Sequence, residues 1–373
     1  MKTNNIEKLN IALFMIIVAA FFTLVILPED YRAAEIEHLR ERPELTLENI
    51  LYNFAYDYEA FLSDNIAHRS LMLSLARFLG DSQGIVHASS YGFIERTERY
   101  LLFEDRIMEV FHRNPYVEAL YARFINTLAE LAHNGVRVFS LIVPTPAEFL
   151  PEQYRHLSDS QRDAIGHINS LLSDNIITID VYSVLAAHLD EYIFFRTDHH
   201  WTALGAYYAY LAFCYAAGLE PVTLGYYYMY YVDGFLGFLY NERPTPSLRE
   251  NADRIYYFIL RDPYFTTSRA LIDRTATTYA PLFIQGDWDY FDVITSVQNG
   301  RTAVIVKDSF ANCFIPFLAP HYERIIVIDP RHFEEPFSIV EELSLYADVD
   351  LLILNYVFST TFRDIVYMLN NIL

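Results

Sequence analysis

The stretch "TAVIVKDSFANCFIPFLAPHYERIIVIDP", residues Thr302–Pro330, indicates the architecture of this chain. It opens with "TAVIV", a short apolar run with β-branched side chains, as in a strand buried on both faces. A tight polar turn, an apolar helical segment and a second buried strand, "RIIVID", follow. Strand, helix and strand in this order form a parallel pair, because the helix returns the chain to the end of the sheet where it began.

The same alternation of apolar strands and helices continues on both sides of this unit. Helices are expected at residues 115–136, 158–175, 202–217 and 338–347, and strands at residues 137–146, where the strand runs into a loop, 176–183 and 348–357. The first of these helices should end at Asn134–Gly135. We therefore predict an α/β fold with a mostly parallel sheet. Residues 219–299 are rich in Tyr and less regular, and we expect a lid or inserted β structure there.

Composition narrows the class of protein. The chain has 373 residues, of which 53% are hydrophobic and 20% charged, so it can bury a sizeable core. Its formal net charge of -21 argues against nucleic acid as a partner, because phosphate binding needs clustered Lys and Arg. Two cysteines, Cys214 and Cys313, lie in apolar helical contexts and make no disulfide framework.

The N-terminal region contains a candidate membrane anchor. Residues Ile11–Leu27 are apolar apart from Thr23, and as a helix they would span roughly 26 Å, close to the thickness of a bilayer core. Lys2 and Lys8 precede the run, which favours a cytoplasmic N-terminus and an extracytoplasmic main domain. A cleaved signal peptide and a buried N-terminal helix are the alternatives. The length of the run and the lack of a convincing small-x-small cleavage site favour an uncleaved anchor.

We expect the chain to be divided into three parts. We expect a cytoplasmic tail and membrane anchor over residues 1–30 and a helical and loop stalk over residues 31–110. The α/β domain is expected over residues 111–373. Short strands at "YGFI" and "RYLLF" are expected near the end of the stalk.

Three polar sequences follow predicted strands: "VPTPAEF", "RTDHHW" and "KDSF". In open α/β sheets, ligands bind beyond the carboxyl ends of the strands. Asp198 and His200 are two residues apart, so in extended backbone the carboxylate could accept the Nδ1 proton of His200 and leave Nε2 as a base. Ser309 is expected to open a helix, whose free N–H groups can stabilise an oxyanion. The three residues would then form a nucleophile, a base and an orienting acid.

Two other interpretations of these residues remain open. Asp308 or Ser309 could simply cap a helix. Asp198 with the two neighbouring histidines could bind a metal ion, although adjacent His residues rarely converge on one ion and no third and fourth ligands are evident.

The motif "RTDHHWT", together with "VIVKDSFANCFIPFLAPHYERIIVIDPRHF", resembles the DHHW family of bacterial envelope proteins. That family is similar to the SGNH-hydrolase-like alginate O-acetyltransferase proteins. Weaker matches are "FLSDNIAHRS", "LIVPTPAEFLPEQY" and "FLGFLY". The resemblance implies an SGNH-hydrolase-like three-layer fold in which Asp and His precede Ser in the chain.

The resemblance also implies roles for individual residues. Ser309 is the nucleophile, His200 the general base and Asp198 its orienting partner. Lys307 stands where Gly is commoner in SGNH enzymes, which affects the turn at the serine. Further substrate contacts are considered at Arg331, Asn312, Trp201 and His199. For the tryptophan, packing that holds the loop is the expected role.

The function implied by the resemblance is that of a membrane-anchored, extracytoplasmic O-acyltransferase. It would acetylate a cell-envelope or secreted polysaccharide through an acyl-serine, with the acetyl group supplied by a membrane-bound O-acyltransferase and with no cofactor or metal. An acetylesterase with the same three residues and a catalytically idle, polysaccharide-binding scaffold are the alternatives.

Overall fold

The computed structural model describes residues 92–373. The predicted anchor at Ile11–Leu27 and most of the predicted stalk at residues 31–110 lie outside the described residues. Within the described part of the chain, no helix combines the length and the apolar character that a membrane crossing needs.

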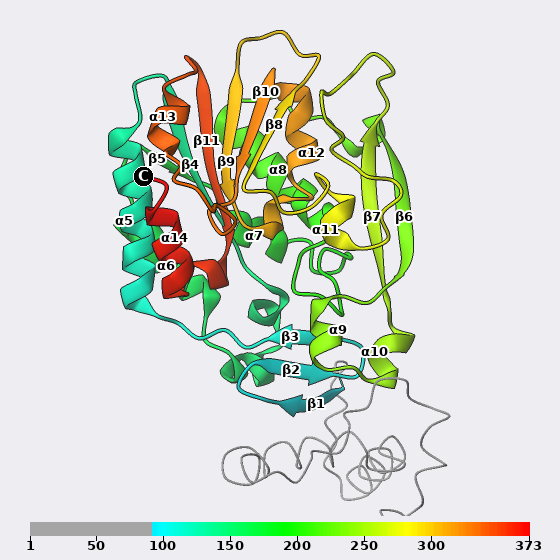
Figure 1. The fold of residues 1–373 in the computed structure, drawn as a ribbon. Coiled ribbons are helices and arrows are strands. Elements are labelled where there is room, and N and C mark those ends of the chain that lie inside the picture. Colours follow the sequence, from blue (N-terminus) through cyan, green and yellow to red (C-terminus); the bar gives the residue numbers. More distant parts are fainter. Residues whose placement is uncertain (1–91) are drawn as a thin grey trace, which may run out of the picture. The chain divides into compact units, whose positions relative to one another are not determined.

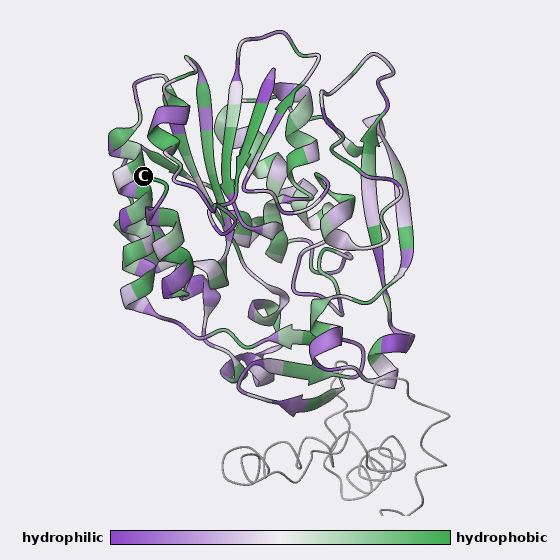
Figure 2. Cartoon of the chain, viewed as in Figure 1, coloured by the Kyte–Doolittle hydropathy of each residue, from purple (hydrophilic) through white to green (hydrophobic). Residues whose placement is uncertain are grey.

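A six-stranded sheet organises most of the described chain (Figure 1). In spatial order its strands are β5 (Ile176–Thr178), β4 (Val136–Val143), β11 (Val349–Tyr356), β9 (Thr302–Lys307), β10 (Arg324–Ile328) and β8 (Tyr290–Ile294). All neighbours are parallel except β8, which runs antiparallel to β10 at one edge. The prediction of an α/β fold with a mostly parallel sheet is confirmed. Strands covered on both faces need apolar side chains throughout, and Figure 2 shows the central strands as hydrophobic.

Side chains that alternate along the strands supply two hydrophobic cores, one on each face of the sheet. In β11, Leu351 and Ile353 belong to one core, and Leu352 and Leu354 belong to the other. The first core is closed by α5 (Pro115–Leu131), α6 (Gln161–Leu171), α13 (Ile339–Leu343) and α14 (Arg363–Asn370). The second is closed by α7 (Val181–Ala186), α8 (Ala203–Ala217) and α12 (Ile315–Leu318). Helices, sheet and helices therefore form three layers.

Smaller β structures surround the main sheet. The strands β1 (Phe93–Arg96), β2 (Tyr100–Phe103) and β3 (Ile107–Glu109) form an antiparallel sheet, which contains the two short strands predicted there. In the Tyr-rich segment, β6 (Tyr227–Phe235) pairs antiparallel with β7 (Asp253–Leu260). The short helices α9 (Phe238–Glu242) and α10 (Pro246–Glu250) connect these two strands, and α11 (Tyr279–Leu282) follows them. This segment thus contains inserted β structure, one of the two expectations, but it also holds short helices and long loops, and its last strand, β8, belongs to the main sheet.

Two element ends differ from the sequence-based expectation. The helix α5 ends at Leu131, short of the predicted stop at Gly135. That glycine instead allows a close approach, because a Cβ there would lie 2.0 Å from the carbonyl oxygen of Ala347. Ser309 opens a 3₁₀ turn, Ser309–Ala311, and α12 begins only at Ile315. The serine therefore lies at the start of a single tight turn and not at the start of an α-helix.

Candidate active site

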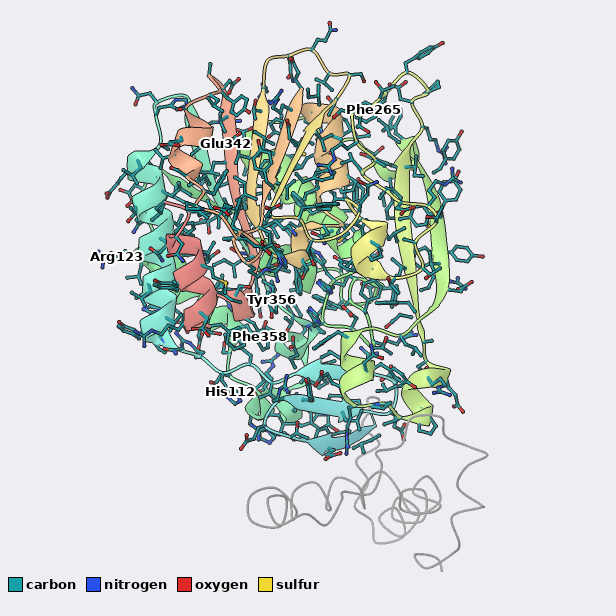
Figure 3. All side chains as sticks on the ribbon, in the orientation of Figure 1. His112, Arg123, Phe265, Glu342, Tyr356 and Phe358 are labelled. Carbon is teal, nitrogen blue, oxygen red and sulfur yellow. The ribbon has the colours of Figure 1, made fainter. Side chains whose placement is uncertain are left out.

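The turn after β9 presents Ser309, and the residue before it fixes that turn. Asp308 is buried, and one of its carboxylate oxygens accepts a hydrogen bond from the Phe310 N–H at 3.0 Å. The other oxygen accepts bonds from the Tyr356 N–H and the Ser359 hydroxyl, at 2.9 and 2.8 Å. Burial raises the pKa of Asp308, and these donors offset part of the rise. Asp308 thereby ties the serine turn to the end of β11, near the position labelled Tyr356 in Figure 3.

Ser309, His200 and Asp198 form one chain of hydrogen bonds. The hydroxyl oxygen of Ser309 is 2.7 Å from Nε2 of His200, and Nδ1 of His200 is 2.6 Å from Oδ1 of Asp198. Asp198 and His200 are buried, whereas Ser309 is partly exposed. The structure thus brings together the three side chains that the sequence singled out, from two distant parts of the chain.

The charge on Asp198 fixes the direction of these hydrogen bonds. Burial alone would raise its pKa, but the imidazoles of His200 and His199 and the donors around it hold the pKa well below its usual range. Those donors include the N–H groups of His200 and Phe238, at 2.9 and 2.8 Å. An ionised carboxylate can only accept, so Nδ1 of His200 donates to it. A neutral His200 then has its free lone pair on Nε2, where it can accept the hydroxyl proton of Ser309.

One backbone donor at the serine is free. The N–H of Ser309 has no hydrogen-bond partner among the described residues. It is the first N–H of the 3₁₀ turn, so no carbonyl of that turn can reach it. The next N–H, of Phe310, is already bonded to Asp308. The turn therefore has one N–H group that can stabilise negative charge developing beside the serine. The several free N–H groups expected at the start of a helix are not present here.

Aromatic side chains hold the histidine and the serine turn in place. The ring of Tyr279 stacks on that of His200 with centroids 4.2 Å apart, and the Phe310 ring lies 4.8 Å away. Trp201 is fully buried, and its indole N–H donates to the carbonyl of Phe310 at 2.8 Å. The lack of exposed surface on Trp201 favours the packing role expected for it over the substrate contact that was also considered. Trp201 binds the histidine loop to the serine turn, as its expected packing role requires.

Two residues that the sequence did not single out shape the loop around Asp198. Gly237 passes so close that a Cβ there would lie 2.2 Å from Cβ of Asp198. Asp253, at the start of β7, accepts hydrogen bonds from the N–H groups of Arg196 and Thr197, at 2.9 and 2.7 Å. Gly237 falls within "FLGFLY", so a signal for it was present. Nothing in the sequence marked Asp253, because its role arises only when β7 packs beside the loop.

Lys307, Asp287, Asp329, Arg331 and Asn312 form a charged cluster behind the serine turn, here called the Lys307 cluster. The buried Nζ of Lys307 lies 2.8 Å from Asp287, 3.0 Å from Asp329 and 2.9 Å from the amide oxygen of Asn312. Arg331 makes two hydrogen bonds to Asp329, at 2.8 and 2.6 Å. Although burial opposes it, the charge of Lys307 lowers the pKa of Asp287 to about 2.

The Lys307 cluster accounts for two residues considered as substrate contacts. Asn312 is fully buried, and its amide nitrogen donates to Asp287 at 2.9 Å while its oxygen accepts from Lys307. Arg331 is held by Asp329. Both polar atoms of Asn312 are thus engaged with protein groups, and Arg331 uses Nε and Nη2 in the same way. His199, the remaining candidate, lies beside His200 with ring centroids 4.1 Å apart and keeps 19% of its side chain exposed.

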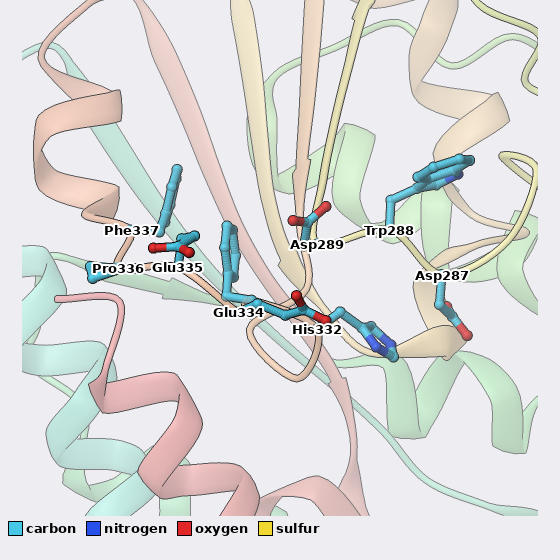
Figure 4. Close-up of a pocket in the computed structure, with 9 residues that line it drawn as sticks. Asp287, Trp288, Asp289, His332, Glu334, Glu335, Pro336 and Phe337 are labelled. Atoms are coloured by element: carbon cyan, nitrogen blue, oxygen red, sulfur yellow. The ribbon is translucent and has the colours of Figure 1, made fainter.

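A cavity of about 520 Å³ adjoins the Lys307 cluster (Figure 4). Residues 287–289 and 332–337 line it, and Asp287 belongs to both the cavity and the cluster. The segment that leads to it holds Ile284 and Gln285 in left-handed backbone, with φ of 47° and 63°. Ser309 does not line this cavity, so the cavity is a neighbour of the hydrogen-bonded triad and separate from it.

A metal site was the alternative for the histidine loop. Asp198, His199 and His200 each offer a ligand atom, and these atoms all lie within 4.8 Å of one another. Oδ1 of Asp198 already accepts a hydrogen bond from Nδ1 of His200. Both oxygens of Asp198 also accept backbone N–H groups. These contacts fit an oriented imidazole better than a tetrahedral ligand set.

Comparisons with known proteins bear on this geometry. A sequence model of the family described as "DHHW protein" matches residues 100–328, more than half of the chain, and this range includes all three triad residues. Among curated proteins, no sequence match was found.

Two of the similar solved structures share the fold. A DHHW family protein from Eubacterium siraeum is similar with a TM-score of 0.69 and 29% identity, over 75% of this chain and 97% of that chain. Bacillus cereus PatB1 with a sulfonyl adduct is similar with a TM-score of 0.59 and 16% identity, over 74% of this chain and 98% of that chain. The O-acetyltransferase domain of Pseudomonas putida AlgJ aligns more distantly, with a TM-score of 0.41 and 13% identity, over 75% of this chain and 99% of that chain.

Proposed function

The chain belongs to the DHHW family, and from this we propose that it is a serine-dependent O-acyltransferase that acetylates the hydroxyl groups of a polysaccharide. The observation that carries the proposal is the hydrogen-bonded chain from Ser309 through His200 to the ionised Asp198. A hydroxyl, an imidazole with a free Nε2 and an orienting carboxylate are the parts that nucleophilic acyl transfer requires.

In the first half of the proposed reaction, Oγ of Ser309 attacks the carbonyl carbon of the acyl donor. Its proton passes to Nε2 of His200 as the Oγ–C bond forms and the carbonyl π electrons move onto oxygen. The free N–H of Ser309 is available to stabilise that oxyanion. The intermediate then collapses, the bond to the leaving group breaks, and His200 returns the proton to the leaving group.

In the second half, an acceptor hydroxyl attacks the acyl-serine. His200 takes the proton of that hydroxyl, the new ester forms, and the proton returns to Oγ of Ser309 as the enzyme is released. Asp198 stays ionised throughout, keeps the imidazole in the productive tautomer and stabilises its positive charge.

Labelling of the serine tests the proposal. A sulfonyl adduct is reported for Bacillus cereus PatB1, and a sulfonyl fluoride or fluorophosphonate should modify this protein at one site. Mass spectrometry should find the label on Ser309, with none in Ser309→Ala and strongly reduced labelling in His200→Ala. A correctly folded wild-type protein that takes no label would overturn the proposal. Retained biological function in Ser309→Ala would instead support an idle scaffold, and loss of activity on chelation would support a metal enzyme.

Transferase and esterase differ in which nucleophile removes the acyl group from the serine. Acetate release and acetyl transfer should therefore be measured together, with and without an oligosaccharide acceptor. We expect added acceptor to divert acetyl groups from acetate to the sugar. Acetate release that is unaffected by any acceptor would identify an esterase.

The proposal extends to the place of action. The apolar run Ile11–Leu27 would hold the domain outside the cell membrane, close to a membrane-bound O-acyltransferase that supplies acetyl groups. Fractionation of cells that express the full chain, with protease added outside, tests this: the domain should sediment with membranes and be digested.

A further inference from the structure

Two buried polar atoms beside the triad have no hydrogen-bond partner among the described residues. They are Oε2 of Glu109, the last residue of β3, and Nδ1 of His199, which lies 4.0 Å from Oδ1 of Asp198 and so beyond hydrogen-bond distance. The large majority of buried side-chain polar atoms are hydrogen-bonded, and an unpaired one is costly to retain. Two such atoms, one of them on the residue whose ring lies beside that of His200, indicate a place where a partner binds.

The ring of His199 is held in place by its neighbours. Its centroid lies 4.1 Å from that of His200, 5.6 Å from that of Phe238 and 6.0 Å from that of Tyr356. Burial, assisted by the neighbouring imidazole, lowers the pKa of His199, which favours the neutral ring. A neutral imidazole offers one donor and one acceptor.

Glu109 reaches the same place from the small sheet. The backbone joins β3 to the loop just before Asp198, because the Ile107 N–H donates to the carbonyl of Arg196 at 2.8 Å. The charges of His199 and Asp198 both act on the carboxyl group of Glu109, so it lies within electrostatic range of both side chains. Burial raises the pKa of Glu109. The carboxyl group of Glu109 is thus close enough for the charges of His199 and Asp198 to act on it.

These groups complement a second hydroxyl on the acceptor. During transfer, Nε2 of His200 must face the hydroxyl that becomes acylated, and the His199 ring is its immediate neighbour. A hydroxyl on the adjacent sugar carbon both donates and accepts, which matches a carboxyl oxygen and an imidazole nitrogen. Water and simple alcohols carry no second hydroxyl on an adjacent carbon. The pair would therefore select a sugar over water.

We propose, resting on the acyl transfer proposed above, that Glu109 and His199 form an acceptor subsite that binds a vicinal diol and positions one of its hydroxyls for attack on the acyl-serine. The acceptor class is then a polysaccharide whose acetylated hydroxyl has a free hydroxyl on the neighbouring carbon. Both residues act on the second half of the reaction, after the acyl-serine has formed.

The test measures how the acyl-serine divides its acetyl group. The full-length protein is acetylated with p-nitrophenyl acetate, and acetate, acetylated cello-oligosaccharide and ethyl acetate are quantified with the sugar or ethanol as acceptor. In Glu109→Gln and His199→Gln, we expect the ratio of sugar transfer to hydrolysis to fall about tenfold and the KM for the sugar to rise. Transfer to ethanol and hydrolysis should persist, so the preference for the diol is lost. Glu98→Gln and His112→Gln change exposed residues of the same types and should keep the wild-type ratio.

The outcomes separate this subsite from the proposed reaction. If wild-type protein forms acyl-serine and transfers acetyl to the sugar, but both variants keep its ratio and its diol preference, the subsite is refuted and the triad stands. If wild-type protein forms no acyl-serine, the proposed reaction fails and the subsite fails with it. Circular dichroism on the near-isosteric Glu109→Gln separates loss of the subsite from loss of fold.

Discussion

Asp198 shows how much of this site depends on a single buried charge. A carboxylate taken out of water is costly unless its oxygens are satisfied. Here Oδ1 accepts from the backbone and the ring of His200, and Oδ2 accepts from the N–H of Phe238. These contacts keep Asp198 ionised, and an ionised acceptor is what makes His200 carry its proton on Nδ1. The orientation of the base therefore follows from the electrostatics of one side chain.

Asp198→Asn should reverse the tautomer of His200 while leaving the shape of the site almost unchanged. An amide can present its N–H₂ group to Nδ1, which would move the imidazole proton to Nε2 and block acceptance from Ser309. We expect turnover of p-nitrophenyl acetate to fall by about 10³–10⁴-fold, as tautomer reversal does in other serine triads. Unfolding curves should confirm a folded protein. A loss smaller than about tenfold would mean that Asp198 does not orient the base.

Gly237→Ala should displace the side chain of Asp198, although it substitutes none of the three triad residues. Its new Cβ would overlap the carboxylate side chain, 2.2 Å from Cβ and 2.5 Å from Oδ2. A misplacement of about 1 Å costs on the order of 100-fold in rate, and overpacking costs about 1–3 kcal/mol of stability. The matched control is Gly166→Ala in α6, where a Cβ meets no atom within 4 Å. That change should leave activity intact and stabilise the helix slightly. Equal activity of both variants would contradict the role given to Gly237.

At the scale of elements, the serine turn is held by two sets of contacts that differ in kind. Asp308 ties the turn to the end of β11 by hydrogen bonds to N–H and O–H groups. The Lys307 cluster joins the end of β9 to the loops before β8 and after β10 through ion pairs. Lys307 is fully buried, and its removal would leave the carboxylates of Asp287 and Asp329 to share the one remaining cation of the cluster, Arg331. Lys307 occupies the position where glycine is commoner in the SGNH-like pattern. At this position the chain has a side chain that forms ion pairs, where a glycine would provide a flexible backbone.

Lys307→Met should therefore lower the free energy of unfolding by about 3–5 kcal/mol, the cost of breaking a buried ion pair. The lowered pKa of Asp287 means that its contribution is present above the unfolded value of about 3.9 and is lost as pH falls toward about 2. Denaturant curves should show the largest difference from wild type near pH 7 and a smaller one below about pH 4. Arg155→Met removes an exposed ion pair with Glu152 and should cost less than about 1 kcal/mol. A pH-independent difference would show that the pair is not the cause.

The parallel sheet and the meeting of Ser309, His200 and Asp198 were predictable from the sequence because local signals mark both. Apolar strands mark a parallel sheet, and polar residues at their carboxyl ends mark a site, both of which are local signals. The details depend on long-range packing that no local pattern reports. Asp253 meets the loop at Thr197 only because β7 packs there, and Asn312 is engaged by a lysine and an aspartate from other elements. The serine turn became 3₁₀ because Asp308 binds the Phe310 N–H within it.

The whole molecule carries a formal net charge of -21, and this charge should bias the choice of acceptor. Like-charged partners approach slowly at low ionic strength, because the repulsion extends over a Debye length of about 30 Å at 0.01 M salt but only about 8 Å at 0.15 M. We expect the kcat/KM for a uronate oligosaccharide to rise several-fold between these two salt concentrations. A neutral cello-oligosaccharide should change little, since it feels no net force, and it serves as the control. If both acceptors respond equally to salt, the surface charge does not act on the acceptor. A uronate rate that falls with salt would reveal a basic acceptor channel and exclude repulsion as the dominant effect.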